Sequence, residues 1–327
     1  MAEKDTVTKD YMQDRETFAD AFNFLLYNGR QVIMAEQLKP LDTTSIVLPY
    51  GEGGKAVAIQ KYRDVLKMVT AMEDDRAAYL ILGIENQSEI HYAMPVRNML
   101  YDAIQYVSQV EIIAKSNKKE DKKPENSAEF LSGLYKSDRL LPIITLTLYF
   151  GVDEWTAPKD LHSMLAADED ILQFVDNYHL HLIAPAEIAD EDFSKFRTEL
   201  SLALKYVKYS QDKKKLKQVL NEDQSFRSVS RKTANLLNIL TNSKLRYDNR
   251  EEQVDMCEAI EGIISDAKAE GIEEGMREGM KEGMKEGMLR TLANLVKDGV
   301  LTIDSATKRA DMTVEKFEEK NVCYTVT

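Results

Sequence analysis

The chain has 327 residues, of which 43% are hydrophobic and 8% aromatic, so it can fill one large core or two smaller ones and is not disordered as a whole. Its formal net charge of −13 excludes a protein that coats nucleic acid by bulk electrostatics, because phosphate neutralisation needs clustered Lys and Arg. Cys257 and Cys323 lack the paired spacing of a zinc site or a disulfide framework, and no apolar run approaches the ~18 residues that span a bilayer. We therefore expect a cytoplasmic protein that makes no membrane contact and binds DNA, if at all, only locally.

The first clear element is an amphipathic helix over Arg15–Tyr27. Phe18, Phe22 and Leu25 recur at helical spacing, and Asn28-Gly29 supplies a stop.

Two apolar runs, 63–70 (RDVLKMVT) and 77–86 (AAYLILGIEN), follow a loop rich in proline and glycine. The acidic stretch 72–76 lies between them, so the pattern predicts a β-hairpin.

A helix is predicted from Pro95 to a charged break near 121–126, where we expect a loop. The apolar run 142–151 (PIITLTLYFG) is typical of a strand buried on both faces, and 178–183 (YHLHLI) of an edge-like strand. His179 and His181 would share one face of that strand, but no third metal ligand is visible nearby.

The C-terminal part is predicted to be helical from Asp190 to about Ile264, and an unusual four-residue repeat follows at 270–288 (EGIEEGMREGMKEGMKEGM). Each glycine inside a helix costs roughly 0.5 to 1 kcal/mol relative to alanine, so an isolated helix here needs compensating packing. Two interpretations stay open: self-association through the glycine and methionine stripes, or a partly disordered linker. After the repeat, a stop at Gly299, the segment 303–310 and a turn starting at Thr313 predict a small helical hairpin.

Two carboxylates of the predicted hairpin are the main candidates for chemistry. A turn centred near 73–75 puts Asp64 either directly opposite Glu85 or diagonal to it on the same face, and Gln87 shares that face because side chains alternate along a strand. Such a pair can hold Mg²⁺ or Mn²⁺, which prefer oxygen ligands and can activate a water against a phosphodiester. The alternative is that both are polar residues at strand ends.

Several stretches in this order, FADAFNFLLYNGRQVI, RDVLKM, ILGIENQSEIHYAMPVRNMLYDAIQY and PIITLTLYFGVDEW, resemble the recombination-promoting nuclease/transposase family, which belongs to the PD-(D/E)XK nuclease superfamily. The resemblance covers about residues 10–260. It implies an α/β fold with a restriction-endonuclease-like core sheet flanked by helices, followed by a mostly helical C-terminal region. We divide the chain into a nuclease-like core (1–185), a helical region (186–265), a Gly/Met-repeat helix or linker (266–290) and a small helical hairpin (291–327).

The resemblance also implies roles for individual residues. Asp64 matches the motif aspartate, and Glu85-Asn86-Gln87 matches the Glu-X-Lys element with glutamine in place of lysine. Gln87 can hydrogen-bond to a water but brings no positive charge. Asp20 matches a position where the superfamily often adds an acidic metal ligand; the alternative for it is an exposed helix face. A last group follows the second motif strand at helical spacing and could line the path of a phosphate backbone: Arg97, Tyr101 and Gln105.

The sequence therefore predicts a Mg²⁺-dependent endodeoxyribonuclease that cuts DNA and promotes recombination or mobile-element activity, and that forms a homo-oligomer through its C-terminal helices. The alternative is a catalytically weak nuclease-fold protein that acts as an oligomeric DNA-binding or assembly module. Integrase-type transposase chemistry would need a third acidic residue in a different fold order, which the strand pattern does not supply.

Overall fold

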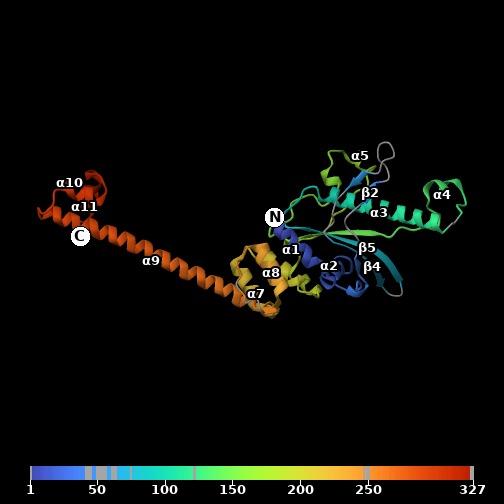
Figure 1. Cartoon of the computed structure of the whole chain (residues 1–327), viewed down its shortest axis with the longest axis horizontal. Coiled ribbons are helices and arrows are strands. Elements are labelled where there is room, and N and C mark those ends of the chain that lie inside the picture. Colours follow the sequence, from blue (N-terminus) through green and yellow to red (C-terminus); the bar gives the residue numbers. More distant parts are fainter. Residues whose placement is uncertain are drawn as a thin grey trace. The chain divides into compact units, whose positions relative to one another are not determined.

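The structure is a computed structural model that describes residues 2–40, 46–48, 57–59, 65–73, 76–120, 123–245, 247 and 251–324. It divides into two compact units, Met1–Ala259 (unit 1) and Ile260–Thr327 (unit 2). The expectation of an α/β protein is confirmed at this level, because unit 1 holds a mixed sheet with helices packed on it (Figure 1).

The main sheet of unit 1 has five strands in the order β1-β4-β5-β6-β7. Pairing is antiparallel between β1, β4 and β5 and parallel from β5 through β6 to β7. The strands of this sheet are β1 (Lys39–Pro40), β4 (Val65–Glu73), β5 (Arg76–Gln87), β6 (Ile143–Tyr149) and β7 (His181–Ile183). Two small antiparallel pairs accompany it: β2 (Ile46–Leu48) with β3 (Val57–Ile59), and β8 (Val229–Ser230) with β9 (Gln253–Val254).

The predicted hairpin is formed by β4 and β5. Its pairs run from Val65 opposite Ile84 to Glu73 opposite Arg76. The prediction for β6 is also confirmed, since this apolar strand is buried along almost its whole length between two parallel neighbours. The short strand β7 lies at the sheet edge as expected, although only three of the six predicted residues belong to it.

Helices cover both faces of the sheet (Figure 1). On one face α1 (Ala2–Gln13) contacts β4 and β5, and α2 (Arg15–Tyr27) packs on α1. The predicted bounds of α2 are confirmed: the Asp14 carboxylate accepts a hydrogen bond from the Thr17 amide at its start, and Asn28 adopts left-handed backbone at its end. On the other face α3 (Met94–Lys119) contacts β6, with Pro95 in its first turn as expected.

The predicted helical region after Asp190 is only partly helical. It contains α6 (Leu200–Tyr209), α7 (Lys213–Glu222) and α8 (Arg231–Thr241), but β8 and β9 interrupt it. Ladders of two residues carry no periodicity, so the sequence pattern could not reveal them. Helix α8 packs on both α1 and α6, and α2 contacts α6. The largest fully buried side chains include Phe18, Phe22, Tyr206 and Phe226. Unit 1 is completed by two short helices, α4 (Ser127–Ser132) and α5 (Glu169–Leu172), and by 3₁₀ turns at 35–37, 162–164, 185–187, 190–195 and 224–227.

Unit 2 consists of the greater part of α9 (Met256–Lys297), with α10 (Ile303–Ala310) and α11 (Val314–Tyr324). The repeat is helical, because α9 runs through it without a break. Self-association through its glycine and methionine stripes stays a prediction. The predicted terminal hairpin is confirmed: Gly299 takes positive φ after α9, the Thr302 side chain caps α10, and both helices pack on the end of α9. Its core contains Leu289, Leu292, Ala306, Ala310 and Phe317.

Among the described residues, none of the helices combines the length and the apolar composition needed to traverse a bilayer.

Candidate functional site

Glu85 is the central residue of the candidate site, and the sheet register decides which way it faces. In the register of the sheet it stands beside Thr147 of β6, and Gly83 beside Thr145. Both threonine hydroxyls are hydrogen-bonded to side chains of α3, so Glu85 lies on the face that α3 covers. The Glu85 side chain has no solvent exposure.

Arg97 of α3 is the charged partner of this buried carboxylate. Its Nη2 lies 3.2 Å from Glu85 Oε2, while about a third (32%) of the Arg97 side chain is exposed. Its Nε donates a hydrogen bond of 2.9 Å to the Tyr101 hydroxyl, and its guanidinium lies 5.6 Å from the centre of the Tyr101 ring. The predicted common face of Arg97 and Tyr101 is therefore confirmed, and Gln105 follows one turn later, half-buried.

Asp64, the second predicted carboxylate, lies outside the described residues. The described pairs of the hairpin begin with Val65 opposite Ile84. Of the two registers that the sequence left open, this is the one in which Asp64 would stand directly opposite Glu85. The pairing of Asp64 with Glu85 itself stays a prediction.

Gln87 follows Glu85 by two residues and is half-buried. It lines a cleft of about 250 Å³ together with Arg97. The other lining residues come from α1, from the end of β5 and from the segment after it: Asp5, Asn86, Ser88, Glu89, Ile90 and His91. The partly exposed Arg97 thus lies in the wall of this solvent cleft.

The expectation for Asp20 must be corrected. Asp20 does not lie on an exposed helix face but has a structural role. It is buried, and its carboxylate accepts hydrogen bonds from the amides of Arg197 and Thr198 and from the Thr198 hydroxyl, at 2.7 to 3.0 Å. These bonds fix the segment that leads into α6. Asp20 also lies on α2, whose Phe18 ring packs under Lys67 on the sheet face opposite to Glu85. We therefore withdraw Asp20 as a ligand of the same metal ion.

Lys67 cannot supply the positive charge that Gln87 lacks. It is paired with Leu82, one residue out of step with Gly83 and Glu85, so it points to the opposite face. There its Nζ donates to the Gln13 carbonyl at 2.9 Å. Burial lowers the pKa of Lys67 to about 8, and the nearby Asp14 only partly offsets this. Among the described residues, Arg97 is thus the cation that lies against Glu85.

Sequence reasoning missed the polar contacts that hold α3 over this face. Asn98 Nδ2 donates to Thr147 Oγ1 at 2.9 Å, the Thr145 hydroxyl donates to Asp102, and the Tyr178 hydroxyl donates to Asp102 at 2.6 Å. The available signal was the alternation of threonine with apolar residues in 143–149 (IITLTLY), which marks one polar face of a buried strand. We call this set the polar face: Glu85, Thr145 and Thr147 of the sheet with Arg97, Asn98 and Asp102 of α3.

The donor types at the polar face fit a hard divalent cation. Glu85 offers buried carboxylate oxygens, and Gln87, which lines the cleft, offers an amide oxygen; Mg²⁺ and Mn²⁺ take oxygen ligands of these kinds. Within the part of the chain that the structure describes, the polar face included, no group of three or more His, Cys, Asp or Glu residues suited to a metal occurs. His179 lies outside β7 in an isolated bridge with Asp160, and burial lowers the pKa of His181.

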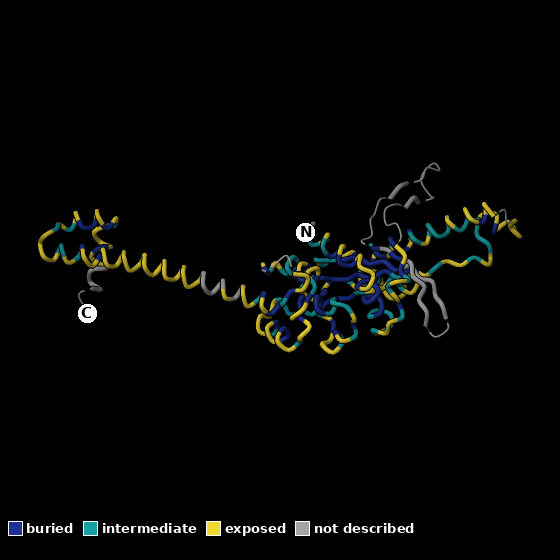
Figure 2. Tube along the Cα trace, turned by 60° about the horizontal axis from the view of Figure 1, so that its bottom comes forward, coloured by how far each residue is buried: buried dark blue, intermediate teal, exposed yellow. Residues whose placement is uncertain are grey.

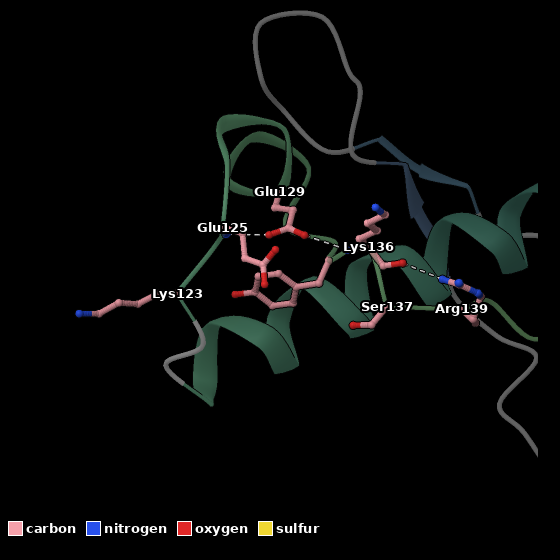
Figure 3. A pocket seen from close by; sticks show the side chains of 7 residues that line it. Lys123, Glu125, Glu129, Lys136, Ser137 and Arg139 are labelled. Carbon is pink, nitrogen blue, oxygen red and sulfur yellow. Dashed lines mark hydrogen bonds between the residues drawn. The ribbon is translucent and has the colours of Figure 1, made fainter.

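A second pocket, of about 620 Å³, is formed by the segments before and after α4 together with one residue of α4 (Figure 3). Its polar groups hold the local loop: the Glu129 carboxylate accepts hydrogen bonds from the amides of Glu125 and Lys136, and Arg139 donates to the Lys136 carbonyl. We therefore assign this pocket a structural role.

The comparisons with known proteins add no relatives: no protein-family model, no curated protein and no solved structure matches the chain.

Proposed function

We propose that unit 1 has a PD-(D/E)XK-like core and is a Mg²⁺- or Mn²⁺-dependent endonuclease that hydrolyses phosphodiester bonds of DNA in the cytoplasm and so promotes recombination or mobile-element activity. The observation that carries the proposal is a fully buried carboxylate, Glu85, paired with Arg97, a residue that lines a solvent cleft. Buried charges are costly unless they are paired, and they concentrate at functional sites. The hairpin register and the helices on both faces of the sheet further support it.

Asp64 and Glu85 would hold the metal ion. When bound, a divalent metal ion lowers the pKa of its water and neutralises charge that develops on the phosphate. Gln87 orients the attacking water through its amide, and Arg97 supplies the positive charge that the glutamine lacks. Tyr101 positions Arg97 at the cleft by accepting the hydrogen bond from its Nε. Arg97 can contact a phosphate oxygen because part of its side chain is exposed.

The second candidate function, a nuclease-fold protein that cuts poorly and acts as an oligomeric DNA-binding or assembly module, is favoured by the same ion pair. Arg97 already neutralises Glu85, so a metal ion must compete with it. The uncharged Gln87 adds no electrostatic help for the reaction.

A plasmid-nicking assay with full-length protein in Mg²⁺, Mn²⁺ or EDTA tests the proposal. We expect cleavage only with metal, and a loss of at least about 100-fold in Asp64→Asn and in Glu85→Gln, since each removes a charge that binds the ion. Glu154→Gln, which removes an exposed carboxylate away from the cleft, serves as the matched control and should cut like the wild type.

Equal cleavage by the wild type and both site variants would remove the site assignment. Absence of cleavage in every metal, combined with tight DNA binding in a filter or gel assay, would favour the second candidate function.

A further inference from the structure

The repeat segment, residues 271–288 of α9, carries a row of apolar side chains that no described part of the chain covers. Met276, Met280 and Met284 are 72%, 69% and 69% exposed. Figure 2 shows this stretch of helix as exposed along its length. Within the described chain, a Cβ added to any of its five glycines would meet nothing within 4 Å. A contiguous apolar row of this kind on a soluble protein marks an interaction surface.

The shape of this surface is set by the four-residue repeat. Residues at i and i+4 form a row along an α-helix, and the next row lies about 100° around it. The glycines 275, 279, 283 and 287 therefore form a groove, and the methionines 276, 280, 284 and 288 form the ridge beside it. Helices whose i±4 ridges enter i±4 grooves cross at about −50°, the commonest class of helix packing. Because one segment offers both ridge and groove, it is complementary to a second copy of itself.

The charges of the repeat complement each other in the same arrangement. A row of glutamates (274, 278, 282, 286) flanks the glycine groove, and a row of bases (Arg277, Lys281, Lys285) flanks the methionine ridge. When two symmetric helices run parallel, opposite flanks face each other, so the acidic row of one copy meets the basic row of the other. An antiparallel pair would bring acidic row to acidic row, which is unfavourable.

We propose that a second copy of this chain docks on the repeat segment. The two α9 helices run in the same direction and cross, and the methionine ridge of each lies in the glycine groove of the other. The steep crossing separates the helices toward both ends, so the closest contact lies in the middle of the segment, around 279–284. This inference stands on the geometry of α9 and does not depend on the nuclease proposal.

Glycine-to-alanine changes give the sharpest test, because they separate packing from helix stability. The variant Gly275→Ala/Gly279→Ala/Gly283→Ala/Gly287→Ala improves helix propensity and clashes with nothing in the described part of a single chain, yet it fills the groove. In sedimentation velocity of the full-length chain over a concentration series, we expect a wild-type dimer and an affinity weakened by about tenfold or more in this variant. Circular dichroism should show equal or higher helix content.

Gly262→Ala is the matched control, since Gly262 lies on the same helix with equal space around it but outside the repeat. It should dimerise like the wild type. A wild type that stays monomeric at the highest concentration overturns the proposal, and so does a fourfold alanine variant that associates as well as the wild type or better.

Charge reversal tests the parallel direction. Glu278→Lys/Glu282→Lys and Lys281→Glu/Lys285→Glu should each associate more weakly than the wild type, and a mixture of the two should form mixed dimers in which both flanks attract. If the acidic-row variant associates as tightly as the wild type, the parallel pairing is wrong.

Discussion

The polar face beneath α3 and the repeat segment of α9 both carry charged side chains, but these are buried or paired at the polar face and exposed on the repeat segment. At the polar face each charged or hydroxyl group meets a partner within the same unit, and Glu85 is buried with Arg97 against it. On the repeat segment, charged and apolar side chains alike are exposed. Burial makes an interaction strong and costly to break, whereas exposure leaves it weak until another molecule covers it. The first region is thus organised for a site and the second for a partner.

The largest expected difference between the two regions concerns their ion pairs. Arg97→Ala leaves Glu85 without its guanidinium partner, and we expect a loss of about 3 kcal/mol in the free energy of unfolding, the low end for a broken buried pair because Arg97 is partly exposed. Arg277→Ala breaks the Glu274–Arg277 pair of α9, whose side chains are mostly exposed, and should change stability by less than about 0.5 kcal/mol. Urea unfolding at neutral pH measures both. Similar small losses of unfolding free energy in both variants would contradict the expected difference between the buried and the exposed ion pair.

A smaller difference is expected for two threonines. Thr147→Val keeps the shape of the side chain but removes the acceptor of the buried Asn98 amide, at a cost of about 1 to 2 kcal/mol. Thr291→Val, on exposed α9, removes only a hydrogen bond to the Gly287 carbonyl and should stay within about 0.5 kcal/mol of the wild type. The comparison uses the same urea titrations, and equal costs would show that the Asn98–Thr147 bond does not secure α3.

An effect of a different kind, on the pH dependence of stability, concerns Lys67, a cation that is buried on the other sheet face and bonded to a neutral carbonyl. Its folded-state pKa of about 8 lies below the unfolded value of 10.5, so between these values the unfolded chain binds more protons. Stability from this group therefore rises as pH increases from 8 to 10. We expect the wild type to gain stability over this range relative to Lys67→Met, while Lys297→Met, an exposed control, follows the wild type. A flat difference between wild type and Lys67→Met would refute the effect of burial.

Local pattern predicted a large part of this fold. The bounds of α2 follow from a cap, a helical period and a left-handed stop, and the β4–β5 pairing follows from a short acidic turn between apolar runs. These features are determined by neighbours in sequence.

Contacts between residues that are distant in the sequence could not be predicted from it. The burial of Asp20 cannot be predicted locally, because no residue near it in the sequence indicates that the amides of Arg197 and Thr198 donate to its carboxylate. Thr145 and Thr147 gave only the alternation of a strand, and their partners lie on α3, more than 40 residues away. The pairing of Arg97 with Glu85 was missed for the same reason, since only the packing of α3 on the sheet brings them together.

Mn²⁺ binding, measured by titration calorimetry on the full-length chain, tests the central claim most directly because it needs no cleavage. We predict one Mn²⁺ site in the wild type, an affinity weakened by at least about tenfold in both Asp64→Asn and Glu85→Gln, and binding at least as tight as wild type in Arg97→Gln, where the competing cation is gone. Equal Mn²⁺ affinity in the wild type and both carboxylate variants would contradict a metal site at Glu85.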